Sequence, residues 1–190
     1  MLANNYKIIL ASQSPRRQML LKEIGYDFEL RLKDIEEDFP SHLKAQEIPL
    51  YLCELKSDAF VAELNEGELL ITADTVVWVK EQVLNKPASK VESINMLELL
   101  SGNMHEVYTA VCLRSKSKKL SFYVCTKVYF KKLTVAEIEF YIDTYKPYDK
   151  AGSYGAQEWM GYIGIEKIDG SYFNVMGLPT KELYENLQKF

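Results

Sequence analysis

Two hydroxyl and two guanidinium side chains lie close together near the start of the chain. Ser12 and Ser14 precede Pro15, and Arg16 and Arg17 follow it. If a helix begins at the proline, its free N–H groups and positive dipole end would join these side chains in binding a phosphate chain. The same residues also fit an ordinary helix start, with a serine N-cap, proline at the first position and two solvated arginines. The segment therefore predicts a phosphate site only if other parts of the chain complete it.

Asp74 and Thr75 follow an apolar run, residues 69–73, that is typical of a buried strand. We expect this strand to end at Asp74, so that the carboxylate projects at the carboxyl edge of the sheet, where α/β proteins usually bind ligands. An ionised carboxylate in that position could bind a metal ion or accept a proton from water. The alternative is a structural aspartate that accepts hydrogen bonds from loop N–H groups.

Three lysines and an acidic pair are further candidates, but each is weak by itself. Lys56 falls on a predicted helix, Lys86 stands in Asn-Lys-Pro and Lys150 in Asp-Lys-Ala-Gly, and most such lysines are surface residues. Glu36 and Glu37 offer the carboxylate oxygens that hard divalent cations prefer, although acidic loops are also common as solvated turns. Only convergence in space would make these side chains one site.

Other features of the sequence argue against several classes of function. The three cysteines form no C-x-x-C pair and the two histidines are not spaced as ligands, so neither a zinc site nor a disulfide framework is expected. A net charge of −4 disfavours extended contact with nucleic acid. The first apolar stretch is too short for a signal peptide, and no run is long enough to span a bilayer. We expect a soluble, cytoplasmic protein.

Alternating strands and helices must position the candidate residues, which favours an α/β fold with a mixed sheet. Hydrophobic periodicity and turn residues predict strands at 6–11, 28–32, 69–73, 76–79, 83–84, 107–113, 120–130 and 162–168. They predict helices at 16–24, 49–64, 91–100, 134–145 and 180–188, the fourth of which opens with the Thr134-x-x-Glu137 form of a capping box. Residues 148–160 have the composition of a binding loop or of an ordinary connection.

Six segments, taken in order, resemble the Maf family (septum formation protein Maf and Maf-like nucleotide pyrophosphatases) across nearly the whole chain. They are Leu10-Ala-Ser-Gln-Ser-Pro-Arg-Arg17, Ala73-Asp-Thr-Val-Val77, Asn85-Lys-Pro87, Leu100-Ser-Gly102 with His105, Asp149-Lys-Ala-Gly-Ser-Tyr-Gly-Ala-Gln157 and Asn174-Val-Met-Gly-Leu-Pro179.

The resemblance implies one domain over residues 1–190 with a fold like that of inosine-triphosphate pyrophosphatases. In that fold an elongated mixed sheet is flanked by helices, and two lobes enclose a cleft. The implied reaction is metal-dependent hydrolysis of nucleoside triphosphates, between the α and β phosphates, to the monophosphate and pyrophosphate. Arg16, Thr75 and Gln157 match positions that mark the subgroup acting on dTTP and UTP. Nucleotide-pool cleansing and a homodimer are further expectations from the same resemblance.

The resemblance and the chemistry of the residues together predict roles for individual side chains. Asp74 matches the family's proton acceptor, and Asp74 with Glu37 would hold Mg²⁺ or Mn²⁺. The expected substrate-binding residues are Ser12, Ser14, Arg16, Arg17, Lys56, Thr75, Lys86 and Gln157. Two alternatives stay open: a pyrophosphatase for modified purine triphosphates such as 7-methyl-GTP, and a non-catalytic nucleotide-binding regulator of cell division.

One segment departs from the pattern of the pyrimidine subgroup. Glu158-Trp159-Met160 follow Gln157 here, where that subgroup usually has a glycine. A carboxylate and an indole beside the base pocket would change substrate choice, unless Trp159 packs against the core or a second subunit.

Overall fold

A computed structural model of the chain describes residues 6–190. Residues 1–5, which precede the first apolar stretch, lie outside the described part. The strands are β1 (Lys7–Leu10), β2 (Glu29–Leu30), β3 (Glu68–Val79), β4 (Gln82–Leu84), β5 (Met104–Arg114), β6 (Lys119–Phe130) and β7 (Ile165–Asp169). The helices are α1 (Pro15–Glu23), α2 (Glu47–Asp58), α3 (Lys90–Leu100), α4 (Val135–Tyr145), α5 (Trp159–Gly164), α6 (Tyr172–Val175) and α7 (Thr180–Lys189), with short 3-10 turns η1 (Val61–Glu63) and η2 (Ala151–Ser153).

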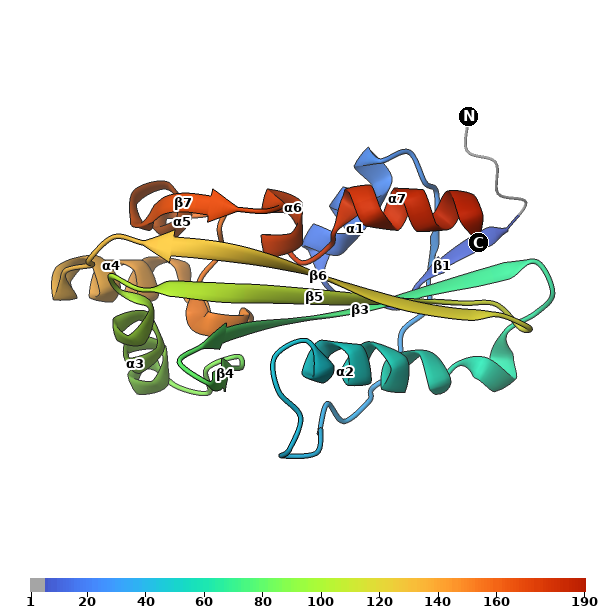
Figure 1. The fold of residues 1–190 in the computed structure, drawn as a ribbon, viewed down its shortest axis with the longest axis horizontal. Helices are drawn as coiled ribbons and strands as arrows, with labels where there is room; N and C mark the ends of the chain where they lie inside the picture. Colours follow the sequence, from blue (N-terminus) through green and yellow to red (C-terminus); the bar gives the residue numbers. More distant parts are fainter. Residues whose placement is uncertain (1–5) are drawn as a thin grey trace.

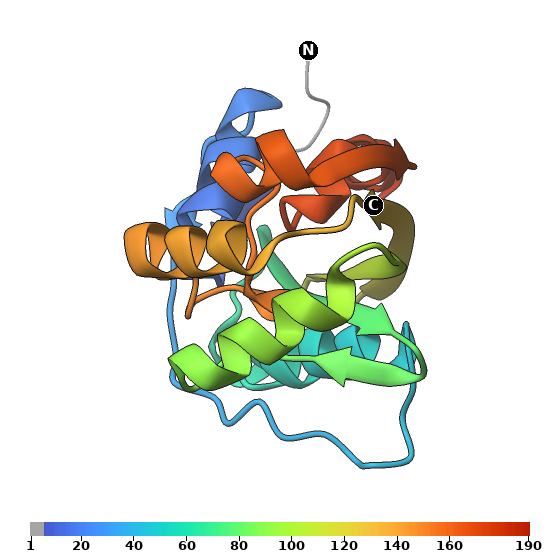
Figure 2. The ribbon, with the colours of Figure 1, turned by 90° about the vertical axis from the view of Figure 1, so that its left-hand side faces the viewer.

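The strands form one elongated mixed sheet in the order β2-β1-β3-β5-β6-β7, and β4 pairs with β3 off this path. β2, β1 and β3 are parallel, and the remaining pairs are antiparallel. α2 runs along one face of the sheet, and α1 and α7 cover the other face near the chain termini (Figure 1). α3, α4 and α5 gather at the far end (Figures 1 and 2). The α/β class and the helix-flanked mixed sheet predicted from the sequence are confirmed.

Separate hydrophobic clusters stabilise the two ends of this sheet. One cluster packs β1 and the first half of β3 against α1 and α7, with Leu21, Ile71 and Leu183 at its centre. Another packs the second half of β3 against α3, α4 and α5, and includes Val77, Leu97 and Met160. The molecule therefore has two lobes, and the long strands β3, β5 and β6 pass through both.

The edge of β3 that faces β1 is open in the middle of the strand. β1 pairs with residues 68–71 and β4 pairs with residues 77–79, while β5 takes the opposite edge from Leu70 to Trp78. Residues 72–76 consequently have a strand neighbour on one side only. This gap between β1 and β4 is where the two lobes can admit a ligand.

The largest error of the sequence-based prediction concerns β3. Asp74 does not stand at the end of a strand, because β3 is 12 residues long and passes through Asp74 and Thr75 to end at Val79. Unbroken pairing with β5, in which Asp74 lies opposite Ala110, holds the polar pair in the ladder. The carboxylate still reaches open space, but it does so at the free edge of a central strand and not at the carboxyl edge of the sheet.

Smaller differences affect α2, α5, β7 and α6. α2 begins at Glu47 and ends at Asp58, so it does not run on to residue 64. The first part of the strand predicted at 162–168 belongs to α5, and β7 begins only at Ile165. A Cβ on Gly161 would lie 1.9 Å from the Ala156 carbonyl oxygen, so only glycine permits this close turn of α5. Helix α6 was not predicted at all.

None of the helices within residues 6–190 is both long and apolar enough to cross a membrane.

Candidate active site

A cleft of about 710 Å³ lies at the free edge of β3 and includes residues 73–77 in its wall. This volume is within the range of about 300–1,000 Å³ that is usual for small-molecule sites. All ten residues predicted to form the site line it: Ser12, Ser14, Arg16, Arg17, Glu37, Lys56, Asp74, Thr75, Lys86 and Gln157. Six basic and four acidic side chains contribute to the lining, on a chain whose net charge is −4. The cleft is thus a locally positive region suited to a polyanion.

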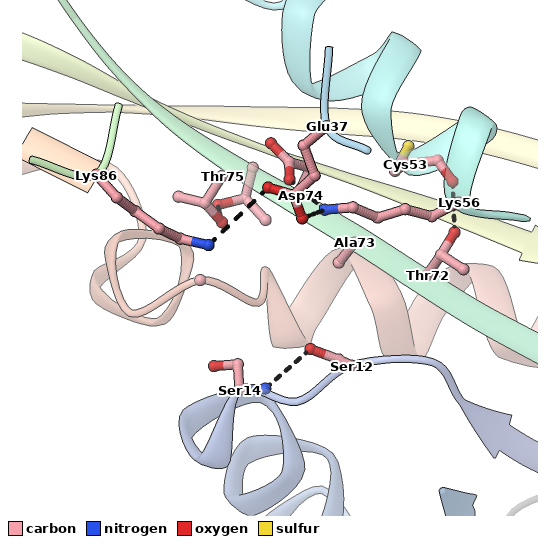
Figure 3. Close-up of polar contacts among 12 residues, drawn as sticks. Ser12, Ser14, Glu37, Cys53, Lys56, Thr72, Ala73, Asp74, Thr75 and Lys86 are labelled. Carbon is pink, nitrogen blue, oxygen red and sulfur yellow. Dashed lines mark hydrogen bonds and ion pairs between the residues drawn. The ribbon is translucent and has the colours of Figure 1, made fainter. Parts of the chain in front are cut away.

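The turn between β1 and α1 forms one side of the cleft. Ser14 is the N-cap of α1, its hydroxyl lying 3.5 Å from the Arg17 amide nitrogen, and Pro15 occupies the first helical position. The Ser12 hydroxyl accepts a hydrogen bond of 3.3 Å from the Ser14 amide, and both serines lie across an open space from Asp74 (Figure 3). The ordinary capping role and the expected phosphate-binding position are therefore both compatible with this turn.

Arg17 differs from its neighbour because its guanidinium is already hydrogen-bonded to the protein. Nε donates to the Gly177 carbonyl at 2.8 Å, Nη1 to the Ala73 carbonyl at 2.9 Å, and Nη2 to the Thr75 hydroxyl at 3.0 Å. The Ala73 carbonyl lies on the stretch of β3 that lacks a neighbouring strand, so the guanidinium supplies the donor that a strand would have supplied. Burial lowers the pKa of Arg17 even though Asp74 opposes that shift. Arg16 has only an ion pair of 3.5 Å with Asp149.

Thr75 lies in a hydrogen-bonded chain whose direction can be deduced. The Thr109 hydroxyl donates its one proton to the Asn174 carbonyl at 2.9 Å. In its 3.0 Å contact with Thr75 it must therefore accept, and Thr75 donates. Since Arg17 also donates to Thr75, the Thr75 hydroxyl has one lone pair left for a ligand. This chain links α1 to β3, β5 and α6 behind the cleft.

Asp74 and Glu37 share one cation. The Lys56 ammonium lies 2.6 Å from Asp74 Oδ1 and 2.7 Å from Glu37 Oε1 (Figure 3). Lys56 reaches this point from α2, since even-numbered side chains of β3 face that helix; Thr72, for example, donates to the Cys53 carbonyl of α2. Lys86 approaches Glu37 from the other side, at 3.9 Å.

Burial sets the protonation properties of the two carboxylates. Asp74 is only 7% exposed, and this burial raises the pKa of its carboxyl group despite the nearby charges of Lys56 and Arg17. Burial also opposes ionisation of Glu37, but its hydrogen bond with Lys56 and the charges of Lys56 and Lys86 leave the pKa of Glu37 below its usual value. Asp74 is therefore the better proton acceptor of the two, and Glu37 the more permanent anion.

The residues present fit a magnesium-type ion in a particular way. No group of three or more His, Cys, Asp or Glu side chains within residues 6–190 is arranged as a metal site. Asp74 and Glu37 already share one cation, the Lys56 ammonium. In nucleotide enzymes Mg²⁺ is usually bound by one or two carboxylates, and substrate phosphates and water complete its coordination. Asp74 and Glu37 are thus suited to a metal that arrives with the nucleotide.

The loop between η2 and α5 closes the end of the cleft that is distant from α2. Gln157 lines the cleft there, together with Tyr154 and Gly155. The Tyr154 hydroxyl is 2.7 Å from His105 Nε2, and burial lowers the pKa of His105 to about 3, so the imidazole is neutral. His105, to which the sequence assigned no role, therefore supports this loop from within the core.

Sequence reasoning missed some residues of the site. Lys150 was considered but left out, yet it lines the cleft and is only 8% exposed, with ion pairs to Asp149 and Glu158. Asp149 was not considered, and the Gly177 carbonyl that holds Arg17 comes from the far end of the chain. The sequence did offer a signal for Asp149, Lys150 and Gly177, because all three lie in segments that carry the family resemblance. In the segment that departs from the subgroup pattern, neither Glu158 nor Trp159 is among the cleft-lining residues, and Trp159 packs on Phe140 of α4.

Comparisons with known proteins agree on one family. The model of the family described as Maf-like protein matches residues 7–190. A dTTP/UTP pyrophosphatase of Parabacteroides distasonis is 50% identical over 186 residues, which cover 97% of this chain and 96% of the relative. A dTTP/UTP pyrophosphatase of Flavobacterium psychrophilum is 52% identical over 180 residues, covering 95% and 92% respectively.

Two solved structures share the fold at low sequence identity. A HAM1 protein from Coxiella burnetii superposes with a TM-score of 0.51 at 14% identity, covering 97% of this chain and all of that one. The Ham1 protein of Staphylococcus aureus superposes with a TM-score of 0.52 at 16% identity, covering 95% and 99%. These likenesses bear on the fold alone, and they agree with the inosine-triphosphate-pyrophosphatase-like architecture expected from the sequence.

Proposed function

Because the chain belongs to the Maf-like protein family, we propose that it hydrolyses dTTP and UTP to the monophosphate and pyrophosphate. The observation that carries this proposal is the placement of Asp74 and the Ser12–Arg17 turn on the walls of one locally positive cleft. A triphosphate carries several negative charges, and an excess of basic side chains in a cleft attracts such a polyanion.

The phosphates would lie between the α1 turn and β3. Ser12, Ser14, Arg16 and Lys86 have donors free to turn toward the cleft, and Lys56 can exchange one carboxylate partner for a phosphate oxygen. Arg17 contributes mainly through the positions of the Ala73 carbonyl and the Thr75 hydroxyl, because most of its donors are already used. We therefore assign Arg17 the role of a positioning residue, in place of the phosphate-binding role expected from the sequence.

Asp74 would accept the proton of the attacking water. Water adds to the α phosphorus, the bond between that phosphorus and the α–β bridging oxygen breaks, and pyrophosphate departs from the opposite side. The raised pKa of the buried carboxyl group makes Asp74 a stronger base than an exposed aspartate. A divalent ion held by Asp74 and Glu37 would neutralise charge on the phosphates when it is bound. Gln157 would read the base, since its amide can both donate to and accept from the carbonyl and imide edge of a pyrimidine.

The decisive test is pyrophosphate release from a panel of triphosphates with Mg²⁺ or Mn²⁺, comparing the wild type with Asp74→Asn. We expect dTTP and UTP to be cleaved fastest, and the substitution to lower kcat by about 10²–10⁴-fold while the fold is kept. Asp58→Asn, at the exposed C-terminal end of α2, is the matched control and should leave kcat unchanged.

The panel also separates the alternatives. Fastest release from a modified purine triphosphate such as 7-methyl-GTP would replace the pyrimidine assignment. No release from any triphosphate would favour a nucleotide-binding regulator. A near-normal rate of Asp74→Asn with UTP would remove Asp74 from the role of base.

A further inference from the structure

Glu158 directly follows the base-reading Gln157, but its carboxylate is directed away from the cleft. Oε2 accepts a hydrogen bond of 2.5 Å from the Tyr141 hydroxyl, and Oε1 lies 3.0 Å from the Lys150 ammonium. Glu158 is not among the residues that line the cleft. The carboxylate therefore does not face a bound base, and its charge is already compensated within the protein.

Tyr141 ties this carboxylate to the main chain of the loop. Its side chain is fully buried on α4, and its hydroxyl accepts a hydrogen bond of 3.1 Å from the Gly155 amide. A phenol has one proton, so Tyr141 accepts from Gly155 and donates to Glu158. Burial and the bond to Glu158 raise the pKa of Tyr141, which keeps that proton in place. The loop is thus fixed two residues before Gln157 by a group that depends on Glu158.

Lys150 extends the same network to the phosphate side of the cleft. Its ammonium lies 2.6 Å from Asp149 Oδ1, and Asp149 Oδ2 is 3.5 Å from Arg16 Nη1. A nearly buried ammonium needs charged partners, because desolvation otherwise disfavours it strongly. Without Glu158, Lys150 would have only the exposed Asp149 to hold its position in the cleft wall.

The Gln157 and Glu158 side chains fold over the same glycine. A Cβ on Gly155 would lie 2.9 Å from Gln157 Nε2 and 2.9 Å from Glu158 Cδ, so only glycine leaves room for both side chains. Tyr141 holds the Gly155 amide, and Glu158 accepts the Tyr141 proton. The Glu158 carboxylate therefore helps to fix the main chain over which the Gln157 side chain lies.

We infer that Glu158 is a positioning residue that sets base discrimination, because it locks Gly155, Gln157 and Lys150 in the geometry that reads a pyrimidine. This inference rests on the proposed function. Glu158 would influence substrate choice through its contacts with Tyr141 and Lys150, without contact with the base.

The test compares kcat and KM for UTP and GTP in two variants of the full chain. Glu158→Gln keeps the shape but removes the charge beside Lys150, and Tyr141→Phe removes the hydroxyl that joins Gly155 to Glu158. We expect each to lower kcat/KM for UTP about tenfold, mainly through KM, with little change for GTP. Gln157→Ala shows the full loss of base reading for reference, and Glu166→Gln, on an exposed position of β7, is the matched control.

The outcomes distinguish the inference from the function on which it rests. If the wild type releases no pyrophosphate from either nucleotide, the proposed function fails and the inference fails with it. If the wild type prefers UTP and both variants keep the same UTP-to-GTP ratio, whether their rates fall or not, only the inference is overturned. Thermal unfolding of each variant shows whether the fold is damaged. A damaged fold would lower the rates with UTP and GTP alike.

Discussion

Arg17 combines the charge of a phosphate ligand with the hydrogen bonds of a structural residue. Its guanidinium donates to Gly177, Ala73 and Thr75, which belong to three separate segments of the chain. Lysine retains the charge but has no planar fork with which to reach three acceptors in different directions. Without the guanidinium, the Gly177 and Ala73 carbonyls would be buried without a donor, at a cost of about 1–3 kcal/mol for each group.

We therefore predict that Arg17→Lys lowers the free energy of unfolding by about 2–4 kcal/mol, measured by urea denaturation. Arg16→Lys is the matched control, since Arg16 makes only one long contact with the protein, and its unfolding free energy should change by about 0.5 kcal/mol or less. Equal stabilities for the two variants would contradict the structural role of Arg17.

At the scale of residues, the sequence predicted which side chains gather but not what each one touches. All ten candidate residues line one cleft, which lies at the free edge of β3. Arg16 and Arg17 could not be told apart, since the acceptor that distinguishes Arg17 is a carbonyl 160 residues further along the chain. Lys150 was discounted on the base rate of surface lysines, and its burial between two carboxylates is a tertiary feature.

The start of β3 is held by a charged group at the lobe that contains the termini. Glu68 is buried, and Arg31 donates to both of its carboxylate oxygens, at 3.2 and 2.9 Å, from the segment that follows β2. These hydrogen bonds lower the pKa of Glu68 to about 2. A carboxyl group with a depressed folded-state pKa stabilises the fold above its unfolded pKa, and this stabilisation is lost as the pH falls through the folded value.

We expect Arg31→Met to lower the free energy of unfolding by about 1–2 kcal/mol at pH 7, after allowance for partial solvent screening. The difference from the wild type should shrink as the pH falls from about 4.5 toward 2. Urea denaturation across this range measures it. Lys116→Met, which removes an exposed pair with Glu66 at 4.0 Å, should have no comparable effect. A difference that stays constant with pH would rule out the Glu68 carboxylate as its source.

At the scale of elements, most helices and strands followed from periodicity and caps. The Thr134 capping box is present as predicted, with Glu137 reaching back to the Thr134 amide. The prediction was wrong where tertiary pairing overrides local preference: Asp74 is a poor strand former, but β3 continues through it because β5 pairs with this part of the strand. Residues 162–164 were assigned to a strand because a short apolar run does not distinguish a helix from a strand.

The cleft joins two lobes that are packed around separate cores. A nucleotide bound as proposed would contact the α1 turn in one lobe and the Gln157 loop in the other, across the open edge of β3. A ligand that binds only the folded state stabilises it by about 2.7 kcal/mol at a free concentration of 100 times Kd. For a chain of this size such a stabilisation raises Tm by roughly 5–10 °C.

Asp74→Asn permits this experiment with an uncleaved natural substrate. With Mg²⁺ present, we expect UTP to raise the Tm of Asp74→Asn by several degrees, and inorganic triphosphate at the same concentration to raise it by clearly less. The reason is that triphosphate engages the α1 turn, Lys56 and Lys86 but leaves the Gln157 loop without a partner. Equal shifts for the two ligands would mean that only the phosphates are bound. In that case the second lobe would take no part in recognition, and the selectivity for dTTP and UTP would have to arise after binding.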